Sequence, residues 1–281
     1  MKQLSVVIPA FNEAAMIERC LGSVVGQRGL DRLEVVVVAN GCRDATAELA
    51  RGFGDPVRVV ELAEGSKHRA LNAGDAECTL FPRVYLDADV RISPDCLLRC
   101  HEALAGGLLA VAPTPRFHTA DSGFLVRSFY RGWSRTPYFT GGRMIGSGFY
   151  ALSEAGRGRF DSFPPVISDD GFVHGLFDRD ERRTLPDCSF EINAPRTLEG
   201  LVAIATRSRL GALELRDRGF TPREPAGEGT TAAGQLANLL GAPVPTLAYS
   251  LIRLLTRRRA ARQFRAGRLD HWERDESTRS G

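Results

Sequence analysis

The segment from Leu33 to Val38 constrains the fold of this chain most. It reads Leu-Glu-Val-Val-Val-Val, with four β-branched residues in succession. Such residues favour extended backbone, and an unbroken apolar run is typical of a parallel strand that is buried on both faces. Parallel neighbours in a sheet must be joined by long crossovers, usually helices. The chain is therefore expected to fold around a sheet that helices cover on both sides.

Other apolar runs of strand length alternate with helical patterns along the first part of the chain. Strands are predicted at 4–8, where Pro9 is expected to end the strand, and at 57–62, 84–86, 108–113 and 146–152. Helices are predicted at 12–25, 44–53, 67–73 and 94–105. This order predicts an α/β fold with a doubly wound, mostly parallel sheet flanked by helices. Ligands of such sheets bind at the carboxyl ends of the strands, where residues 9–13, 39–44 and 87–89 lie.

The composition sets the size of the fold and excludes one class of partner. The chain has 281 residues, of which 43% are hydrophobic, enough for one large domain with an appendage or for two small domains. A net charge of only +3 gives no overall field for nucleic-acid binding. Six cysteines form no Cys-x-x-Cys pair, and a core strand stands where a signal peptide would, so we expect reduced thiols in a cytoplasmic protein. Cys96 and Cys100 have helical spacing, but two cysteines do not make a zinc site.

The C-terminal part of the chain differs in composition from the rest. Residues 222–229 are rich in Pro, Gly and Glu, so we predict a joint between a domain at 1–221 and a helical, basic appendage at 222–281. Residues 229–252 carry no formal charge, and an arginine-rich segment without acids follows. This pattern fits a helix on an anionic membrane surface, at the inner face of the membrane. A helical pair packed on the domain, with a solvated arginine face, is the alternative.

The segment Tyr85-Leu86-Asp87-Ala88-Asp89-Val90 places two carboxylates at the end of a predicted strand. Because side chains alternate along a strand, Asp87 and Asp89 are expected to point the same way and to hold one cation. Carboxylate oxygens suit Mg²⁺ or Mn²⁺, which commonly hold a phosphate. The alternative is an exposed turn in which both acids are capped or solvated.

Four segments in order resemble the family 2 glycosyltransferases. They are Val-Val-Ile-Pro-Ala-Phe-Asn-Glu (6–13), Val-Val-Ala-Asn-Gly-Cys-Arg-Asp-Ala-Thr (37–46), Lys-His-Arg-Ala-Leu-Asn-Ala-Gly (67–74) and Leu-Asp-Ala-Asp (86–89). The resemblance extends over roughly residues 4–215. It implies the GT-A fold, a nucleoside diphosphate sugar as donor, a divalent cation, and transfer with inversion.

The first two segments imply the nucleoside side of the donor site. The backbone at Pro9 and Ala10 is expected to approach the base, and Asn12 and Glu13 to contact the nucleoside, although both residues also fit the start of a helix. Asn40 stands where the family commonly has an aspartate that contacts the base. An amide can still hydrogen-bond a uracil edge. Asp44 is expected to cap the next helix.

The other donor-side residues are implied by the later segments. Lys67 and Asn72 are expected beside the donor, where surface solvation is the alternative for Lys67. The resemblance gives Asp89 as the metal ligand and Asp87, next to Ala88, as a contact to the ribose or to a metal-bound water. Two arginines in Thr-Arg-Ser-Arg-Leu-Gly resemble the family's arginine-rich segment near the diphosphate, namely Arg207 and Arg209.

The acceptor side of the site is expected later in the chain. Ile-Ser-Asp-Asp-Gly-Phe-Val (167–173) resembles the family's acidic segment at the start of a helix. By this match Asp170 is the catalytic base and Asp169 orients it or contacts the acceptor; helix capping is the alternative for both. Gly148 matches a glycine that leaves room for the acceptor sugar, although a tight turn would need it equally. The rings between Phe117 and Thr140 are expected to be helical core, with one or two available to a sugar.

These expectations combine into one function. The chain is predicted to transfer a sugar from a UDP-sugar, or second a GDP-sugar, to a saccharide or lipid-linked hydroxyl acceptor in the synthesis of a cell-surface polysaccharide, glycolipid or glycoconjugate. The rival enzyme is a nucleotidyltransferase of related fold, but its glycine-rich basic loop after the first strand is absent from Pro9–Glu13. The rival without activity is a degenerate nucleotide-sugar binder, which only Asn40 supports.

Overall fold

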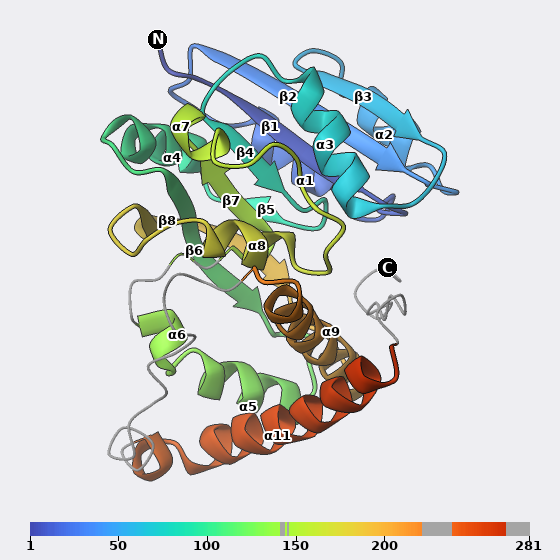
Figure 1. Cartoon of the computed structure of the whole chain (residues 1–281). Coiled ribbons are helices and arrows are strands. Elements are labelled where there is room, and N and C mark those ends of the chain that lie inside the picture. Colours follow the sequence, from blue (N-terminus) through green and yellow to red (C-terminus); the bar gives the residue numbers. More distant parts are fainter. Residues whose placement is uncertain (141–143, 145, 221–237, 268–281) are drawn as a thin grey trace. The chain divides into compact units, whose positions relative to one another are not determined.

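The computed structural model describes residues 1–140, 144, 146–220 and 238–267, and its contacts divide the chain into two compact units (Figure 1). The first unit holds residues 1–116, 144–165 and 177–192. The second holds residues 117–143, 166–176 and 193–281. Within the second unit, α11 (Pro243–Arg265) packs on α5 (Phe124–Trp133) and α9 (Leu198–Asp217). A domain boundary after residue 221 stays a prediction. The predicted joint at 222–229 lies outside the described residues.

An eight-stranded mixed sheet forms the centre of the first unit, in the order β3-β2-β1-β4-β7-β6-β8-β5. Strands β3, β2, β1 and β4 are parallel, whereas β7 is antiparallel to β4 and to β6. The strands are β1 Gln3–Ala10, β2 Arg32–Asn40, β3 Val57–Leu62, β4 Arg83–Leu86, β5 Arg91–Ile92, β6 Ala110–His118, β7 Phe149–Leu152 and β8 Arg182–Asn193. The expected doubly wound α/β sheet is confirmed, and its parallel half is the half that the valine-rich strand predicted.

Helices cover both faces of the parallel strands in the first unit. These helices are α1 Ile17–Val25, α2 Thr46–Arg51, α3 Lys67–Glu77, α4 Cys96–Ala105 and α7 Glu154–Arg157. One face of β1 and β2, with Val6 and Val35, joins the core that α1 and α4 complete. On the other face α3 approaches so closely that a Cβ at Gly74 would lie 2.5 Å from Val7. Burial of β2 on both faces is therefore confirmed.

Strand β1 does not end at Pro9, because Pro9 and Ala10 continue the pairing with β2. On the other side of β1, pairing with β4 covers only Ser5 to Val7. Proline lacks the amide hydrogen that a fully paired central position needs. Pro9 is tolerated here because only one of its two neighbouring strands is still paired.

The second unit is helical where it is described, with α5, α6 (Pro137–Thr140), α8 (Asp169–Gly175), α9 and α11. Rings of Phe117, Tyr130, Trp133 and Phe139 pack on one another, with centroids 4.7 Å apart for Phe117 and Tyr130 and 4.8 Å for Trp133 and Phe139. Phe129 is buried with Tyr130 and Trp133 packed beside it, whereas Phe124 is 62% exposed, so the expected helical core is found for only part of these rings. None of the described helices has the length and apolar composition needed to cross a membrane.

Candidate functional site

Two loops at the carboxyl end of the sheet are tied together by hydrogen bonds. Asn12, which follows β1 with a φ of 53°, accepts a bond from the Arg43 amide through Oδ1 over 2.8 Å. The Glu13 amide donates to Thr46 Oγ1 over 2.8 Å, and the Ala14 amide donates to the carboxylate of Asp44. The loop after β1 is therefore held by residues of the loop after β2. Thr46, whose role the sequence did not indicate, is fully buried at this junction.

Asp44 does not cap α2 as predicted. The helix begins at Thr46, its N-cap residue is Ala45, and no side chain caps it. Asp44 Oδ1 instead accepts from the amide of Thr46 over 3.1 Å, while Oδ2 accepts from Ala14 over 3.0 Å. These bonds lower the pKa of Asp44 although burial alone would raise it. Its carboxylate therefore joins two loops instead of ending one helix.

Asn40 joins three segments of the candidate site. Its side chain is buried, and Nδ2 donates to the carbonyl of Ala10 over 2.6 Å. Its Oδ1 accepts from the amide of Ser66, just before α3, over 2.8 Å. Both ends of the side-chain amide thus bind backbone, so Asn40 holds the end of β1 and the start of α3 together. Its contact to the base stays a prediction.

Replacing Asn40 with aspartate, the family's common residue, is expected to destabilise this protein. The carboxylate would face the Ala10 carbonyl without a hydrogen to donate, and a buried unsatisfied group costs 1–3 kcal/mol, more if charged. We expect the free energy of unfolding to fall by roughly 2–3 kcal/mol at pH 7, measured by urea denaturation. Asn12→Asp is the matched control, because Asn12 uses its acceptor and an aspartate keeps it. Equal stability of the two variants would contradict the role assigned to Asn40.

Asp87, Ala88 and Asp89 follow the end of β4, but they do not continue it. The strand ends at Leu86, and the amide of Val90 donates to the carbonyl of Asp87 over 3.1 Å, which makes a turn. The expectation that strand alternation aligns the two carboxylates is therefore wrong. The turn is fixed by a hydrogen bond that the Asp87 amide donates to the carbonyl of Gly148 over 2.8 Å.

Three carboxylates act electrostatically on the buried thiol of Cys20 on α1. Burial raises the pKa of this thiol, and the negative charges of Asp89, Asp87 and Glu13 raise it further. The three carboxylates therefore act on the same buried thiol. Cys20 also donates a hydrogen bond to the Asp87 carbonyl over 3.8 Å. Residues from the ends of β1 and β4 thus form one negatively charged centre, which is what the carboxyl edge of such a sheet was predicted to hold.

Lys67 supplies the positive charge at this centre. It is the first residue of α3, and its Nζ lies 2.7 Å from Asp87 Oδ1, with its side chain 22% exposed. Lys67 is therefore not simply solvated at the surface, which was the alternative for this residue. Gly148, with a φ of 94°, lies on the other side of Asp87, and a Cβ there would come within 3.3 Å of Asp87 Oδ2. Gly148 thus supports the acidic turn, and its acceptor role stays a prediction.

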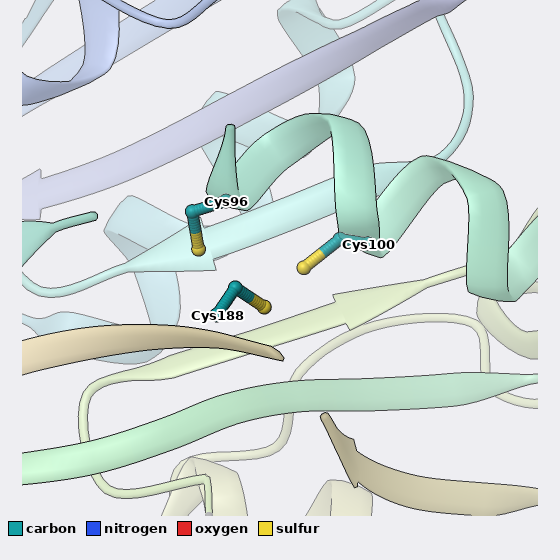
Figure 2. A group of neighbouring side chains, drawn as sticks. All are labelled: Cys96, Cys100 and Cys188. Carbon is teal, nitrogen blue, oxygen red and sulfur yellow. The ribbon is translucent and has the colours of Figure 1, made fainter. Parts of the chain in front are cut away.

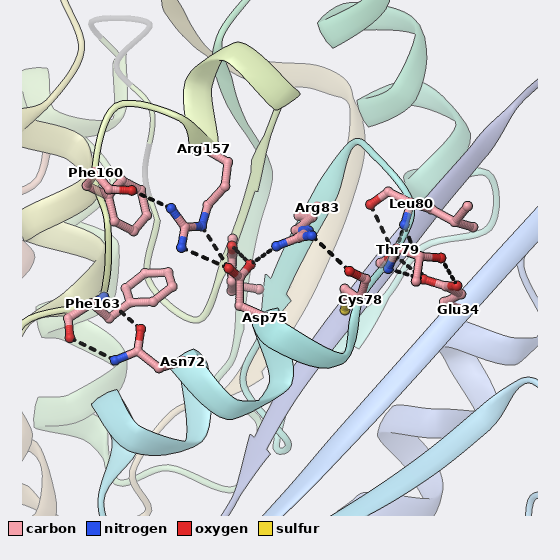
Figure 3. Close-up of polar contacts among 12 residues, drawn as sticks. Glu34, Asn72, Asp75, Cys78, Thr79, Leu80, Arg83, Arg157, Phe160 and Phe163 are labelled. Carbon is pink, nitrogen blue, oxygen red and sulfur yellow. Dashed lines mark hydrogen bonds and ion pairs between the residues drawn. The ribbon is translucent and has the colours of Figure 1, made fainter.

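Asn72 and Asp75 of α3 fix the helix behind the candidate site, as Figure 3 shows. Asn72 exchanges two hydrogen bonds with the backbone of Phe163, over 3.0 and 2.8 Å. Asp75 is buried and pairs with Arg83 over 2.6 Å and with Arg157 over 2.8 Å. Because Arg83 lies on β4, this network fixes the strand that leads into Asp87. Asn72 therefore has a structural partner, and its contact to the donor stays a prediction.

Glu34 forms a second polar network at the far end of α3 and β4 (Figure 3). Its carboxylate accepts from Ser5 Oγ over 2.7 Å and from the amides of Thr79 and Leu80 over 2.9 and 3.2 Å. Burial alone would raise the pKa of Glu34, but these bonds and one from the Thr79 hydroxyl lower it from 4.5 to about 2. A pKa lowered by folding stabilises the native state above pH 4.5, and this contribution is lost as the pH falls toward 2.

Glu34→Gln is accordingly expected to cost more stability at neutral than at acidic pH. The free energy of unfolding at pH 7 should fall by on the order of 1–2 kcal/mol, after discounting for solvent screening. The difference from the native chain should shrink as the pH falls from 4.5 toward 2, because Glu34 becomes protonated over this range. Urea denaturation at several pH values measures this, with exposed Glu48→Gln as control. A difference that does not change with pH would contradict the assignment.

Asp169 and Asp170, two of the predicted acceptor-side residues, lie in the second unit at the start of α8, whereas Gly148 lies in the first unit. Ser168 is the N-cap residue and accepts from the Gly171 amide over 3.2 Å. Asp170 Oδ1 accepts from the Ser168 hydroxyl over 2.6 Å and from the Gly171 amide over 2.8 Å, while Asp169 is buried. The helix capping predicted as the alternative is therefore present for Asp170. A base role uses the same carboxylate and stays a prediction.

Arg207 and Arg209 both lie on α9, but on different sides of the helix. Two positions along a helix differ by about 200° around its axis. Arg209 lines a hollow with Arg257 and Arg258 of α11. The structure thus brings Arg209 to the arginines of the C-terminal helix, an association that the sequence did not indicate. That either arginine contacts a diphosphate stays a prediction.

Three cysteines meet in the core of the first unit, as Figure 2 shows. Cys96 and Cys100 of α4 lie beside Cys188 of β8, and their sulfur atoms are all within 4.8 Å of one another. The sequence indicated only that Cys96 and Cys100 have helical spacing, and it did not place Cys188 beside them. Among the described residues no fourth His, Cys, Asp or Glu completes the group, and a structural zinc site needs four ligands. All six cysteines are free thiols, and these three pack as small apolar side chains.

The sequence matches the model of one protein family, "Glycosyl transferase family 2", over residues 5–163. Among curated relatives, 4,4'-diaponeurosporenoate glycosyltransferase of Staphylococcus aureus is 30% identical over 175 residues, which cover 59% of this chain and 43% of the relative. Glycosyltransferase AglE of Haloferax volcanii is 35% identical over 91 residues, which cover 31% of this chain and 30% of the relative. The chain thus spans less than half the length of these relatives.

Solved structures share the fold. The mannosyltransferase PcManGT from Pyrobaculum calidifontis, in complex with GDP-Man and Mn²⁺, is similar with a TM-score of 0.60 and 24% identity over 94% of this chain and 79% of that one. Glucosyl-3-phosphoglycerate synthase from Mycobacterium tuberculosis, with Mn²⁺, UDP and glucosyl-3-phosphoglycerate, gives 0.53 and 23% over 79% and 82% of the two chains. These similarities confirm the expected GT-A fold. The matched segment contains every residue of the charged centre, and the chain belongs to glycosyl transferase family 2.

Proposed function

We propose that this chain transfers a sugar, with inversion, from a nucleoside diphosphate sugar to a hydroxyl of a saccharide or lipid-linked acceptor. The observation that carries the proposal is the charged centre of Glu13, Asp87, Asp89 and Lys67 at the carboxyl edge of the sheet. Membership in the family and the nucleotide-bound neighbours support it. UDP is the first candidate for the nucleotide and GDP the second.

The residues of the charged centre fit a divalent cation. Asp87 and Asp89 offer hard oxygen ligands, and Lys67 lies 2.7 Å from the Asp87 carboxylate. Asp89 and Asp87 would hold Mn²⁺ or Mg²⁺, which would neutralise the charge that develops on the leaving nucleoside diphosphate. Lys67, already beside Asp87, would meet the same phosphates. Asn12 and Glu13 would hold the nucleoside against the backbone of Pro9 and Ala10.

The acceptor hydroxyl needs a base for an inverting transfer. Asp170 would take the hydroxyl proton, the acceptor oxygen would bond to the anomeric carbon, and the bond from that carbon to the diphosphate would break. The two hydrogen bonds that Asp170 accepts both end on Oδ1, so Oδ2 is the atom proposed to take the proton. Asp169 would orient the neighbouring groups.

Metal-dependent donor binding tests the proposal before any acceptor is known. We expect UDP- or GDP-sugars to raise the melting temperature in the presence of Mn²⁺, because a ligand of the native state stabilises it. Asp89→Asn should weaken this binding at least tenfold, whereas exposed Asp180→Asn should leave it unchanged.

Three outcomes of this assay separate the rivals. No shift with any nucleotide sugar and Mn²⁺ would sink the proposal. Binding without transfer or hydrolysis would favour the degenerate binder, whose only support is Asn40. Release of pyrophosphate from a nucleoside triphosphate and a sugar phosphate would identify a nucleotidyltransferase.

A further inference from the structure

Helices α9 and α11 of the second unit pack on each other (Figure 1). Side chains of both helices line an open hollow with a positive wall. The hollow has a volume of about 410 Å³. We call it the arginine hollow, and it is lined by Arg209, Leu213, Leu254, Arg257, Arg258 and Ala261. Its wall therefore combines three guanidinium groups with an apolar surface, a combination suited to an amphiphilic anion.

The arginine hollow brings like charges together. Among the described residues, Arg209, Arg257 and Arg258 have no ion pair with Asp or Glu. Burial lowers the pKa of Arg209, and the positive charges of Arg257, Arg253 and Arg216 lower it further. Like charges held together repel one another, so an anion that enters the hollow would relieve this repulsion.

Helix α11 also presents an apolar face to solvent. Its buried side contains Ala248, Ile252, Thr256 and Ala260, one turn apart. The opposite side exposes apolar residues at helical spacing, with 52% exposure for Leu247 and 65% for Leu251. We call this side the leucine face, and it consists of Val244, Leu247, Leu251, Leu254 and Leu255. Leu254 belongs to both features, so the leucine face is continuous with the arginine hollow.

We propose that α11 docks this chain on an anionic phospholipid bilayer, with a headgroup phosphate in the arginine hollow and the leucine face in the interfacial layer. The α11 sequence contains no Asp or Glu, and all its arginines except Arg253 follow its exposed apolar residues, so an anionic bilayer surface would meet both groups. A free phosphate would use the arginines but not the exposed leucines. A nucleic acid would likewise leave the leucine face in water. The proposal goes beyond sugar transfer and does not depend on it.

Vesicle flotation of the full chain tests the docking. We expect binding to phosphatidylcholine vesicles that contain phosphatidylglycerol, weaker binding in high salt, and little binding to phosphatidylcholine alone. The double variant Arg257→Gln/Arg258→Gln should bind roughly ten- to thirtyfold more weakly, at about 1 kcal/mol for each arginine. Leu247→Gln/Leu251→Gln should weaken binding by roughly tenfold or more. The charge-matched control Arg28→Gln/Arg183→Gln changes exposed arginines of the first unit and should bind as the native chain does.

Circular dichroism and thermal unfolding first establish that each variant is folded, since all the changed side chains are exposed. Equal binding to neutral and anionic vesicles would overturn the role of the arginine hollow. Binding that the leucine variant retains in full would overturn the role of the leucine face. If inorganic phosphate or an oligonucleotide binds through Arg257 and Arg258 while vesicles do not bind, the bilayer is the wrong partner. Nucleotide-sugar binding of the same variants is measured separately, so failure here leaves the proposed function standing.

Discussion

Asp75→Asn is expected to lower the free energy of unfolding by about 3–5 kcal/mol, because it removes one side of a buried ion-pair network. The Asp75 side chain is only 8% exposed and pairs with Arg83 and Arg157, which are 12% and 13% exposed. Tyr85 also donates its hydroxyl hydrogen to Asp75 over 2.5 Å. A neutral amide would leave two buried guanidinium groups without their counter-charge. Urea denaturation followed by circular dichroism measures the loss.

Helix α3, which carries Asp75, also offers a matched control. Glu77 is exposed and pairs with Arg58 over 3.6 Å, so Glu77→Gln should change stability by no more than about 0.5 kcal/mol. Acidification gives a second readout. Burial alone would raise the pKa of Asp75, but the bonds from Tyr85, Arg157 and Arg83 lower it below 3.8, so the contribution of Asp75 is lost as the pH falls below that value. A loss under 1 kcal/mol at pH 7 would show that the network does not fix α3 on β4.

Asp170→Asn is expected to reduce kcat by about 10²–10⁴-fold while donor affinity stays unchanged, if Asp170 is the base. An asparagine has nearly the same shape, and its Oδ1 can still accept from the Gly171 amide as Asp170 does now. The helix start should therefore survive, and only the capacity to take a proton is removed. Initial rates with a nucleotide sugar and an acceptor, together with donor binding by calorimetry, measure the two effects separately.

Glu199→Gln is the control for Asp170. Glu199 is an exposed acid in the first turn of α9, also in the second unit, and has no proposed chemical role. Its replacement should leave both kcat and donor affinity near the native values. Transfer by Asp170→Asn at the native rate would remove Asp170 from the mechanism and leave it as a helix-capping residue.

The parallel half of the sheet could be predicted because its signals are local. The valine run of β2 and the boundaries of β3 at Val57 and Leu62 follow directly from apolar runs. Strand β8 was not predicted, because its buried Leu185, Cys188 and Phe190 are interspersed with polar and charged residues. Of the antiparallel half, β6 and β7 overlap the strands predicted at 108–113 and 146–152, whereas β8 and the two-residue β5 were not predicted.

The residues of the charged centre could be predicted, but the bonds that fix them could not. Asp87, Asp89, Glu13 and Lys67 stand in short motifs at strand ends, so local sequence locates them. The pairing of Asp75 with Arg157 joins residues 82 positions apart, and no local pattern specifies such a contact. The same holds for the meeting of Arg209 with the arginines of α11, which depends on how two helices pack.

The amide of Asn40 has a consequence for attempts to change the sugar nucleotide that we propose as donor. It joins the end of β1 at Ala10 to the residue before α3 at Ser66, while Asn12 binds the loop after β2. A graft of any one loop from another enzyme would arrive without its hydrogen-bonding partners. Donor exchange by engineering should therefore succeed only when the three segments are transplanted together, and natural variants are expected to change them in concert.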